Sequence, residues 1–519
     1  MKFKLLFFTL ITSFLLSAQT LPFQNKNLPV EERIKDLVSR LTIEEKLDLL
    51  GGTGFDSKPV IRLGIPAIRM TDGPLGVRWG QATAFPSGIS MGATWDTVLT
   101  RKVGQAMGLE TLAKERDMLL GPCINIHRVP HGGRNFESYG EDPFLSGRLG
   151  VAWVKGVQQM GVLTSTKHFA VNNQEHERMT IDVKVSERAM REIYWPAFET
   201  IVKEADTWTI MASYNRLNGP YATANNHLLN EVLKNEWGFR GFVVSDWGAV
   251  HGDLDVALGG TDLEMPTGEF MNVKNLKPFV DSGKLPVSVV DDKIARLIRV
   301  MMISGLFDRV PGSLPTALNT KEHQELARQA ATESIVLLKN DKSLLPLDIN
   351  KLKSVAVIGP NAASARTGGG GSSMVLPFYS VSPLDAFNEV GTGKFKVTYA
   401  PGATIPGDVK PIEAKYFKNL KADYFNNQKL EGTPALSRAE SQINFDWGDA
   451  IPAPEIGKDN YSVRLTGELV PEVSGDYQLD GLSDDGIRVW IDDKLIIGRT
   501  MVPKPGRQNI NLKQGKQSR

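Results

Sequence analysis

Four of the short apolar runs in this chain end in polar residues whose side chains could carry out chemistry. Asp72 and Asp246 supply carboxyl groups, Lys167 and His168 follow a third run, and Tyr214 follows a fourth. A carboxylate can attack an electrophilic carbon or accept hydrogen bonds from hydroxyl groups, and a lysine can form a Schiff base with a carbonyl substrate. These five residues predict one small-molecule site, provided that the fold brings them together.

Strands and helices alternate from Glu31 to Phe307, which is the pattern of parallel α/β folds. In a barrel of this kind the C-terminal ends of the strands meet at one mouth, so side chains distant in sequence become neighbours. Polar residues at strand ends can equally be helix caps or turn formers, and the pattern alone leaves that alternative open. The predicted strands are Pro66–Met70, Met118–Leu120, Leu163–Thr166, Thr209–Ala212 and Phe242–Val244.

Helical patterns frame these strands at both ends of the segment. Apolar residues over 34–41 recur with helical spacing, and Thr42 with Glu45 forms a capping box that begins a second helix. An apolar stripe over 294–301 predicts a further helix that ends at Gly305. These helices supply core and imply no chemistry of their own.

A second region follows the Pro- and Gly-containing linker Arg309–Pro315. We expect a helix over Glu322–Thr332, then strands at the apolar run 335–338 and at Val355–Ile358. The loop Thr367–Ser373 carries four consecutive glycines, but no Lys-Ser/Thr pair follows and the spacing does not fit a dinucleotide fingerprint. A mobile loop over a neighbouring site is the better interpretation than a phosphate loop.

After Thr404 aromatic and polar residues alternate, which predicts an antiparallel β domain. The Asp484-Asp485-Gly486 sequence is better explained as a β-turn than as a calcium site, because regularly spaced oxygen ligands are missing. The runs that carry the alternation are 424–425, 445–447, 461–465 and 487–491.

Composition narrows the class of protein. The 519 residues exceed one ordinary domain, and a formal net charge of +1 without long charge runs gives no reason to expect a nucleic-acid partner. Cys123 is the single cysteine, so an internal disulfide and a Cys-based metal centre are excluded. Lys2 and Lys4 precede an apolar run that ends near Ala18, which predicts a signal peptide over residues 1–18 and an exported, periplasmic or extracellular protein. The run is too short for a membrane span.

Several motifs in the first 270 residues resemble, in order, those of the N-terminal barrel of glycoside hydrolase family 3 β-glucosidases. They are Thr71-Asp72-Gly73-Pro74, Gly132-Gly133-Arg134-Asn135-Phe136-Glu137-Ser138, Lys167-His168-Phe169 with Asn172-Asn173-Gln174-Glu175, Val244-Ser245-Asp246-Trp247 and Asp262-Leu263-Glu264-Met265-Pro266. The resemblance implies a (β/α)8 TIM-like barrel at 30–308, the first part of an α/β sandwich domain at 316–407, and an inserted all-β PA14-like module at 408–519. The chain then looks like the N-terminal part of a longer enzyme.

The same resemblance implies a retaining, exo-acting β-glycosidase, with β-glucosidase as the expected activity on small β-glucosides or oligosaccharides. Asp246 matches the nucleophile that forms a covalent glycosyl-enzyme, and Lys167 and Arg134 are expected to favour its ionised form. No metal or cofactor is implied. The residues matching sugar-binding positions are Asp72, Arg134, Lys167, His168, Met211, Tyr214 and Trp247.

The general acid is the part of the pattern that the sequence does not supply. The family's glucosidases take it from a glutamate that we expect beyond the end of this chain, and Glu137 is better explained by a structural ion pair. Ala170-Val171-Asn172-Asn173 stands where the N-acetylhexosaminidases of the family carry a Gly-His-Gly loop, which argues against that activity. A crippled or non-catalytic sugar-binding protein, β-xylosidase specificity and an aldolase-like role for Lys167 remain as alternatives.

Overall fold

The computed structural model describes residues 21–310, 315–403, 411–445, 447, 451–481, 483, 486–499 and 506–513. The predicted signal peptide and the Asp484-Asp485 pair lie outside these residues. The chain forms two compact units, one from residues up to 353 with 364–395 and the other from 354–363 with the residues from 396 onward.

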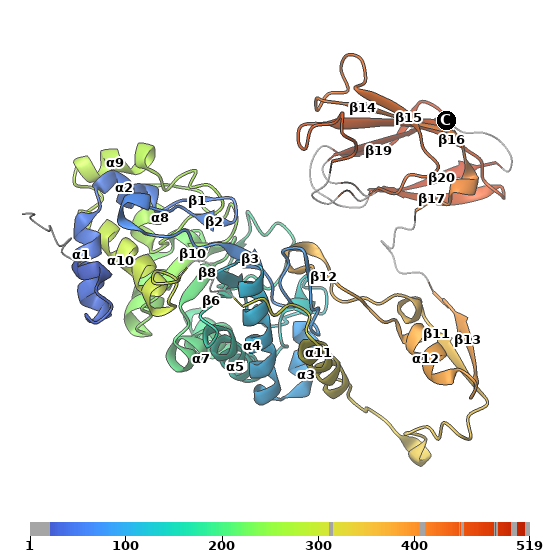
Figure 1. Ribbon diagram of the computed structural model, residues 1–519, viewed down its shortest axis with the longest axis horizontal. Coiled ribbons are helices and arrows are strands. Elements are labelled where there is room, and N and C mark those ends of the chain that lie inside the picture. Colours follow the sequence, from blue (N-terminus) through green and yellow to red (C-terminus); the bar gives the residue numbers. More distant parts are fainter. Residues whose placement is uncertain are drawn as a thin grey trace, which may run out of the picture. The chain divides into compact units, whose positions relative to one another are not determined.

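Five parallel strands form the sheet of the first unit, in the order β10-β8-β6-β5-β3 (Figure 1). Parallel bridges join Val244 to Leu263 and Gly51 to Glu264, and an antiparallel bridge joins Asp56 to Arg69 beside β3. Because the segment 51–56 thus contacts both edges, the sheet closes on itself as a barrel. The strands are β3 (Met70–Asp72), β5 (Met118–Leu120), β6 (Leu163–Phe169), β8 (Thr209–Ala212) and β10 (Phe242–Ser245).

The predicted α/β barrel class is confirmed, although the barrel is less regular than an eightfold repeat. The segments around Gly51 and Leu263 close it through bridges instead of full strands. Short strand pairs decorate its mouth: β1 (Gly52–Thr53) with β2 (Asp56–Ser57), and β7 (Asp182–Val183) with β9 (Arg216–Leu217).

Helices connect the successive strands, as a parallel order requires. Between the strands lie α3 (Gly88–Thr94), α4 (Thr97–Ala113), α5 (Pro143–Gln158), α6 (Glu187–Ala189), α7 (Pro196–Ala205) and the π-helical segments η4 (Met190–Tyr194) and η6 (His227–Glu236). The remaining helices of the barrel are α1 (Val30–Arg40), α2 (Ile43–Asp48), α8 (Leu254–Gly259), α9 (Val273–Asp281) and α10 (Val287–Ile303). The predicted Thr42–Glu45 capping box begins α2, and Gly305, with φ 77°, follows the end of α10.

Three predicted strands differ in their bounds from the sequence pattern, and β10 differs only in ending one residue later, at Ser245. β3 starts at Met70 instead of Pro66, since Pro66 has no backbone N–H to give to a ladder. β6 continues through Lys167 and His168 to Phe169. Asp72 and both residues of the Lys-His pair therefore belong to the strands themselves, where pairing with neighbouring strands fixes their backbone.

Alternate residues of the strands enter two different apolar cores. Leu119 of β5 packs with the helices α4, α5 and α7, while Met118 and Leu120 pack with residues of α1 and α10. Met211 of β8 belongs to the second of these cores. Since side chains alternate along a strand, this burial on both sides explains why the strands read as continuous apolar runs.

The segment after the linker packs on the barrel at two places. Helix α11 (Lys321–Glu333) contacts α3 and α4, and β12 (Leu376–Pro377) pairs in parallel with β4 (Gln81–Ala82). Helix α12 (Pro383–Gly391) follows. The prediction of a strand at 335–338 is wrong: these four residues are 58 to 92% exposed, and no described strand pairs with them.

The second unit consists of strands. β11 (Ser354–Ile358) pairs in parallel with β13 (Lys396–Ala400), and the other pairs are antiparallel, which confirms the predicted β domain. Tyr424 and Ala422 of the central strand are fully buried. Strand β14 (Phe417–Phe425) lies between β15 (Leu436–Ala439) and β16 (Ser462–Leu469), β17 (Gly475–Gly481) pairs with β20 (Gly506–Leu512), and β18 (Ile487–Ile491) pairs with β19 (Lys494–Arg499).

Candidate active site

The C-terminal ends of β3, β6 and β10 bring together the polar residues predicted from the sequence. The Lys167 ammonium lies 4.0 Å from the Asp72 carboxylate, and the His168 Nε2 lies 3.6 Å from Asp246 Oδ2. All four side chains are buried. Parallel pairing accounts for the convergence, because it places the ends of neighbouring strands at one edge of the sheet.

Asp246 directly follows β10 and is held by backbone contacts. Its N–H donates to the Ala212 carbonyl at 3.0 Å, and its Oδ1 accepts from the Trp247 N–H at 2.8 Å. Its Oδ2 is buried and has no hydrogen-bond partner among the described residues. A buried carboxylate oxygen without a partner is costly, which indicates an atom kept free for a ligand.

The pKa of Asp246 departs from the sequence-based expectation. Burial raises it, and although Arg134 and Lys167 lower it as expected, the net pKa lies above the ordinary value. Arg134 and Lys167 therefore favour the charged form of the carboxyl group, whereas burial favours the protonated form.

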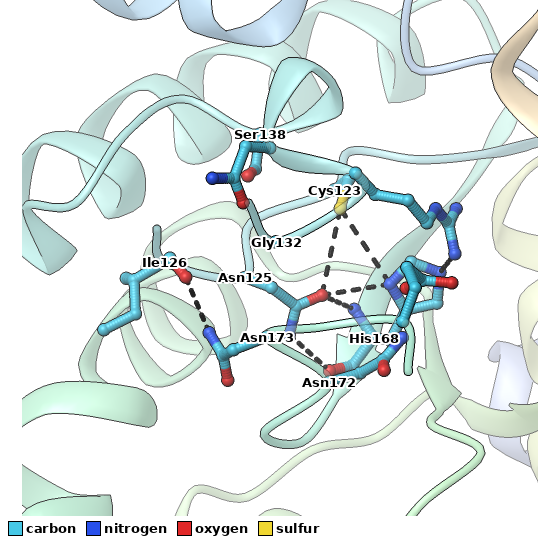
Figure 2. Close-up of a pocket in the computed structure, with 11 residues that line it drawn as sticks. Cys123, Asn125, Ile126, Gly132, Ser138, His168, Asn172 and Asn173 are labelled. Carbon is cyan, nitrogen blue, oxygen red and sulfur yellow. Dashed lines mark hydrogen bonds between the residues drawn. The ribbon is translucent and has the colours of Figure 1, made fainter. Parts of the chain in front are cut away.

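Asn125 fixes the position and the tautomer of the His168 imidazole (Figure 2). The Asn125 amide donates to the His168 carbonyl at 2.9 Å, and Asn125 Oδ1 accepts from the His168 backbone N–H at 2.8 Å and from Nδ1 at 3.0 Å. Burial and the neighbouring Arg134 and Lys167 hold the pKa of His168 well below its usual value. Its Nε2 therefore accepts from Arg134 Nη1, 3.0 Å away.

Arg134 is held by Glu137, which the sequence analysis assigned to a structural ion pair. Glu137, in the short helix η3 (Asn135–Glu137), accepts from Arg134 Nε at 2.7 Å and from Nη2 at 2.9 Å. Burial raises the pKa of Glu137, but Arg134 outweighs burial and the net pKa is lowered. Arg134 Nη2 also donates to Ser372 of the glycine-rich loop at 3.3 Å, so this loop lies against the site as predicted.

Asp72 has a second basic partner that the sequence analysis missed. Arg78 Nη1 donates to Asp72 Oδ2 at 2.9 Å, closer than the Lys167 ammonium on the other oxygen. Arg78 lies six residues after Asp72, in the loop that follows β3, and that short spacing is the signal that could have identified it. Arg78 and Lys167 thus each contact one oxygen of the Asp72 carboxylate.

Two aromatic residues line the nucleophile. The Tyr214 hydroxyl interacts with the carboxyl group of Asp246. The Trp247 indole donates to the Gly54 carbonyl at 3.0 Å, and its ring lies 5.1 Å from that of Phe55, which in turn contacts Trp79. The hairpin of β1 and β2 thus holds the indole beside Asp246.

The remaining predicted residue, Met211, lies in the apolar core. It is 1% exposed and packs with Met70, Met118 and Val244, which face the same side of their strands. It supports the strands that carry the polar residues.

Asn125 is the contact that the sequence did not indicate. It lies in the loop after β5, the one predicted strand for which no polar residue was proposed. With Cys123, Asn172 and Asn173 it lines a cavity of about 10 Å³ behind His168, which has room for about one water molecule (Figure 2). Asn172 Nδ2 and Asn173 Oδ1 have no partner among the described residues.

The described part of the chain contains no group of three or more His, Cys, Asp or Glu side chains suited to a metal ion. Within the same residues, no helix is long and apolar enough to cross a membrane.

A buried carboxylate with a free oxygen, among basic and aromatic side chains at a barrel mouth, is the arrangement expected of a glycoside hydrolase. Residues 56–300 match the glycosyl hydrolase family 3 N-terminal domain, and residues 419–517 match the PA14 domain. The barrel is thus a glycosyl hydrolase family 3 N-terminal domain, and a PA14 domain follows it in the sequence.

The relatives are β-glucosidases. The β-glucosidase of Rhizobium radiobacter is 37% identical over a match that covers 89% of this chain and 57% of the relative. Thermostable β-glucosidase B of Acetivibrio thermocellus is 43% identical, and the match covers 72% of this chain and 51% of the relative. The crystal structure of the Kluyveromyces marxianus β-glucosidase with glucose has a TM-score of 0.75 at 32% identity, covering 93% of this chain and 62% of that chain. The structure of β-glucosidase 3B of Thermotoga neapolitana with glucose has a TM-score of 0.66 at 36% identity. It covers 70% of this chain and 55% of that chain. The chain thus spans little more than half the length of these relatives.

Proposed function

We propose that this chain carries the sugar-binding site and the nucleophile of a retaining, exo-acting β-glucosidase. The observation that carries the proposal is the buried Asp246 Oδ2, which has no hydrogen-bond partner among the described residues. In the proposed first step this oxygen attacks the anomeric carbon of a terminal β-glucosyl residue, the glycosidic C–O bond breaks, and the leaving oxygen takes a proton. Water then hydrolyses the ester and restores the carboxylate.

Charged groups near Asp246 support sugar binding. Asp72 accepts two hydroxyl hydrogen bonds in a geometry that discriminates epimers, and Lys167 and Arg134 donate to hydroxyls of the same ring. Two solved structures similar to this one, those of the Thermotoga neapolitana and Kluyveromyces marxianus β-glucosidases, contain glucose, which supports glucose as the glycone. β-Xylosidase specificity is the alternative on the same scaffold.

Protonation of the leaving group is the step for which we assign no residue. A missing general acid slows the reaction about a hundred- to ten-thousand-fold, and least for leaving groups that need little protonation. We therefore expect the 519-residue chain to release nitrophenol from nitrophenyl β-glucoside much faster than glucose from cellobiose. Equal, high rates on both would contradict this expectation.

Trapping tests the nucleophile directly. The 519-residue chain is incubated with 2,4-dinitrophenyl 2-deoxy-2-fluoro-β-glucoside, digested and examined by mass spectrometry, with the corresponding xyloside in parallel. We expect one fluoroglucosyl adduct, on Asp246, and none in Asp246→Asn. Reversible sugar binding without any adduct would identify a sugar-binding protein instead.

A borohydride-reducible adduct on Lys167 would point to aldolase-like chemistry. An adduct on another carboxylate would move the nucleophile away from Asp246. Either result contradicts the proposed mechanism.

A further inference from the structure

Arg178 lies over the ring of Tyr214, the aromatic neighbour of Asp246, and sugar binding does not explain this position. Its guanidinium carbon lies 4.4 Å from the centroid of the Tyr214 ring. The same ring carries the hydroxyl that interacts with Asp246. A cation at this distance over an aromatic face is attracted by the ring and restricts its motion.

Glu175 holds the guanidinium over the ring. Its Oε2 lies 2.5 Å from Arg178 Nη1, and the two side chains are 26% and 32% exposed. The Glu175–Arg178 ion pair is therefore partly shielded from solvent at the edge of the site. Its two charges attract each other more strongly there than at a fully exposed surface.

The glycine turn before Arg134 packs directly against Glu175. A Cβ atom at Gly133 would lie 2.8 Å from Glu175 Cγ, and Gly133 has φ 86°, so no other residue suits the position. Glu175 thus bridges the loop that presents Arg134 and the arginine that covers Tyr214. The proposed sugar contacts do not explain the Asn-Gln-Glu sequence at 173–175. Its Glu175 connects the loop of Arg134 with Arg178, which gives the sequence a structural role.

The charge of Arg178 also acts on the phenol. Burial and Asp246 raise the pKa of Tyr214, while Arg178 and Arg134 lower it. A cation over the ring withdraws electron density from it, which makes the hydroxyl a better hydrogen-bond donor to a carboxylate.

We propose that Arg178, held by Glu175, is a positioning residue that fixes Tyr214 and through it the attacking carboxylate of Asp246. This inference rests on the proposed function. It assigns Arg178 to formation of the glycosyl-enzyme and not to sugar binding. Removing its charge should therefore slow attack by Asp246 and leave ground-state affinity unchanged.

The test measures inactivation of the 519-residue chain by the fluoroglucoside, which separates affinity (Ki) from the rate of covalent attack (kinact). We expect Arg178→Met to lower kinact about three- to thirtyfold, the range of a partly desolvated cation–π contact, with Ki unchanged. Arg178→Lys keeps a cation and should recover part of the rate. Arg188→Met is the matched control, because Arg188 is 84% exposed and pairs with Glu192 on the surface.

A double-mutant cycle with Tyr214→Phe separates positioning from a general loss of stability. If Arg178 acts through the Tyr214 hydroxyl, Arg178→Met has no further effect on kinact in the Tyr214→Phe chain. If the two substitutions act independently, their fold-reductions in kinact multiply. An unchanged kinact, a raised Ki alone, or multiplying effects would overturn the inference. If the unmodified chain is not trapped at all, the proposed function fails instead, and the two failures remain distinguishable.

Discussion

Replacing Glu110 by alanine should release the segment that follows the linker from the barrel. Glu110 lies in α4 and its side chain is 1% exposed. Its carboxylate accepts from the Thr83 backbone N–H at 2.9 Å, the Thr83 hydroxyl at 2.6 Å and the Asn319 N–H at 2.9 Å, and it contacts His323 Nδ1 at 2.8 Å. Thr83 follows β4, while His323 belongs to α11. One carboxylate therefore joins the segments on either side of the linker.

The unsatisfied donors set the size of the loss. Glu110→Ala leaves the backbone N–H groups of Thr83 and Asn319 without acceptors, and each buried unsatisfied donor costs about 1–3 kcal/mol. The two donors together give a loss of about 2–6 kcal/mol.

The charge of Glu110 gives this contribution a pH dependence. Burial raises its pKa, but His323, Thr83 and Asn319 outweigh burial and the net pKa is lowered. A carboxyl group with a lowered folded-state pKa stabilises the native state above its unfolded pKa. That stabilisation is lost as pH falls through the folded pKa.

Hydrogen exchange of the 519-residue chain, followed by mass spectrometry, measures the loss where it occurs. Peptides from α11 should open with a free energy about 2–6 kcal/mol lower in Glu110→Ala than in the unmodified chain. The control is Glu325→Ala on the same helix, since Glu325 is 61% exposed and pairs with Arg328, and such pairs contribute about 0–1 kcal/mol. Equal exchange in the two variants would refute the argument that Glu110 anchors the helix.

Three further predictions concern buried groups. Burial lowers the pKa of Lys293 to about 8 although Asp262 raises it, so stability to urea should rise with pH from about 8 to 10.5, and this rise should vanish in Lys293→Met. Burial raises the pKa of the Cys123 thiol to about 12, so a thiol reagent at pH 8 should modify it in denaturant and leave the native chain unmodified. A Cβ atom at Gly369 would lie 2.3 Å from the Phe136 ring, so Gly369→Ala should lower kcat/KM on nitrophenyl β-glucoside about ten- to a hundredfold, with partial recovery in the double variant with Phe136→Leu.

The strand ends of the barrel were predictable because their burial forces a simple pattern. β5 and β8 have the predicted bounds, and Asp72, Lys167 and Asp246 meet as expected. A run of apolar residues marks a buried strand, although β3, β6 and β10 continue into the polar residues that follow the run. This signal is local, so a single sequence contains it.

Contacts made by loops were not predictable in the same way. Asn125 acts on His168 from the loop after β5, and no periodicity marks a loop residue. The net pKa of Asp246 was also missed, because the sequence names the nearby cations but not the depth of burial that opposes them. The strand expected at 335–338 failed because an apolar run does not specify its partner strand.

The charge pairing around Asp246 suits the proposed reaction. Arg134 is engaged in two hydrogen bonds by Glu137, and Arg78 takes one oxygen of Asp72. Asp246 contacts His168 at 3.6 Å, and this imidazole is neutral because the pKa of His168 is strongly lowered. No direct ion pair within this part of the chain cancels the negative charge of Asp246. An oxocarbenium-like transition state develops positive charge at the anomeric carbon, and an uncancelled carboxylate in a site of low dielectric stabilises that charge most strongly.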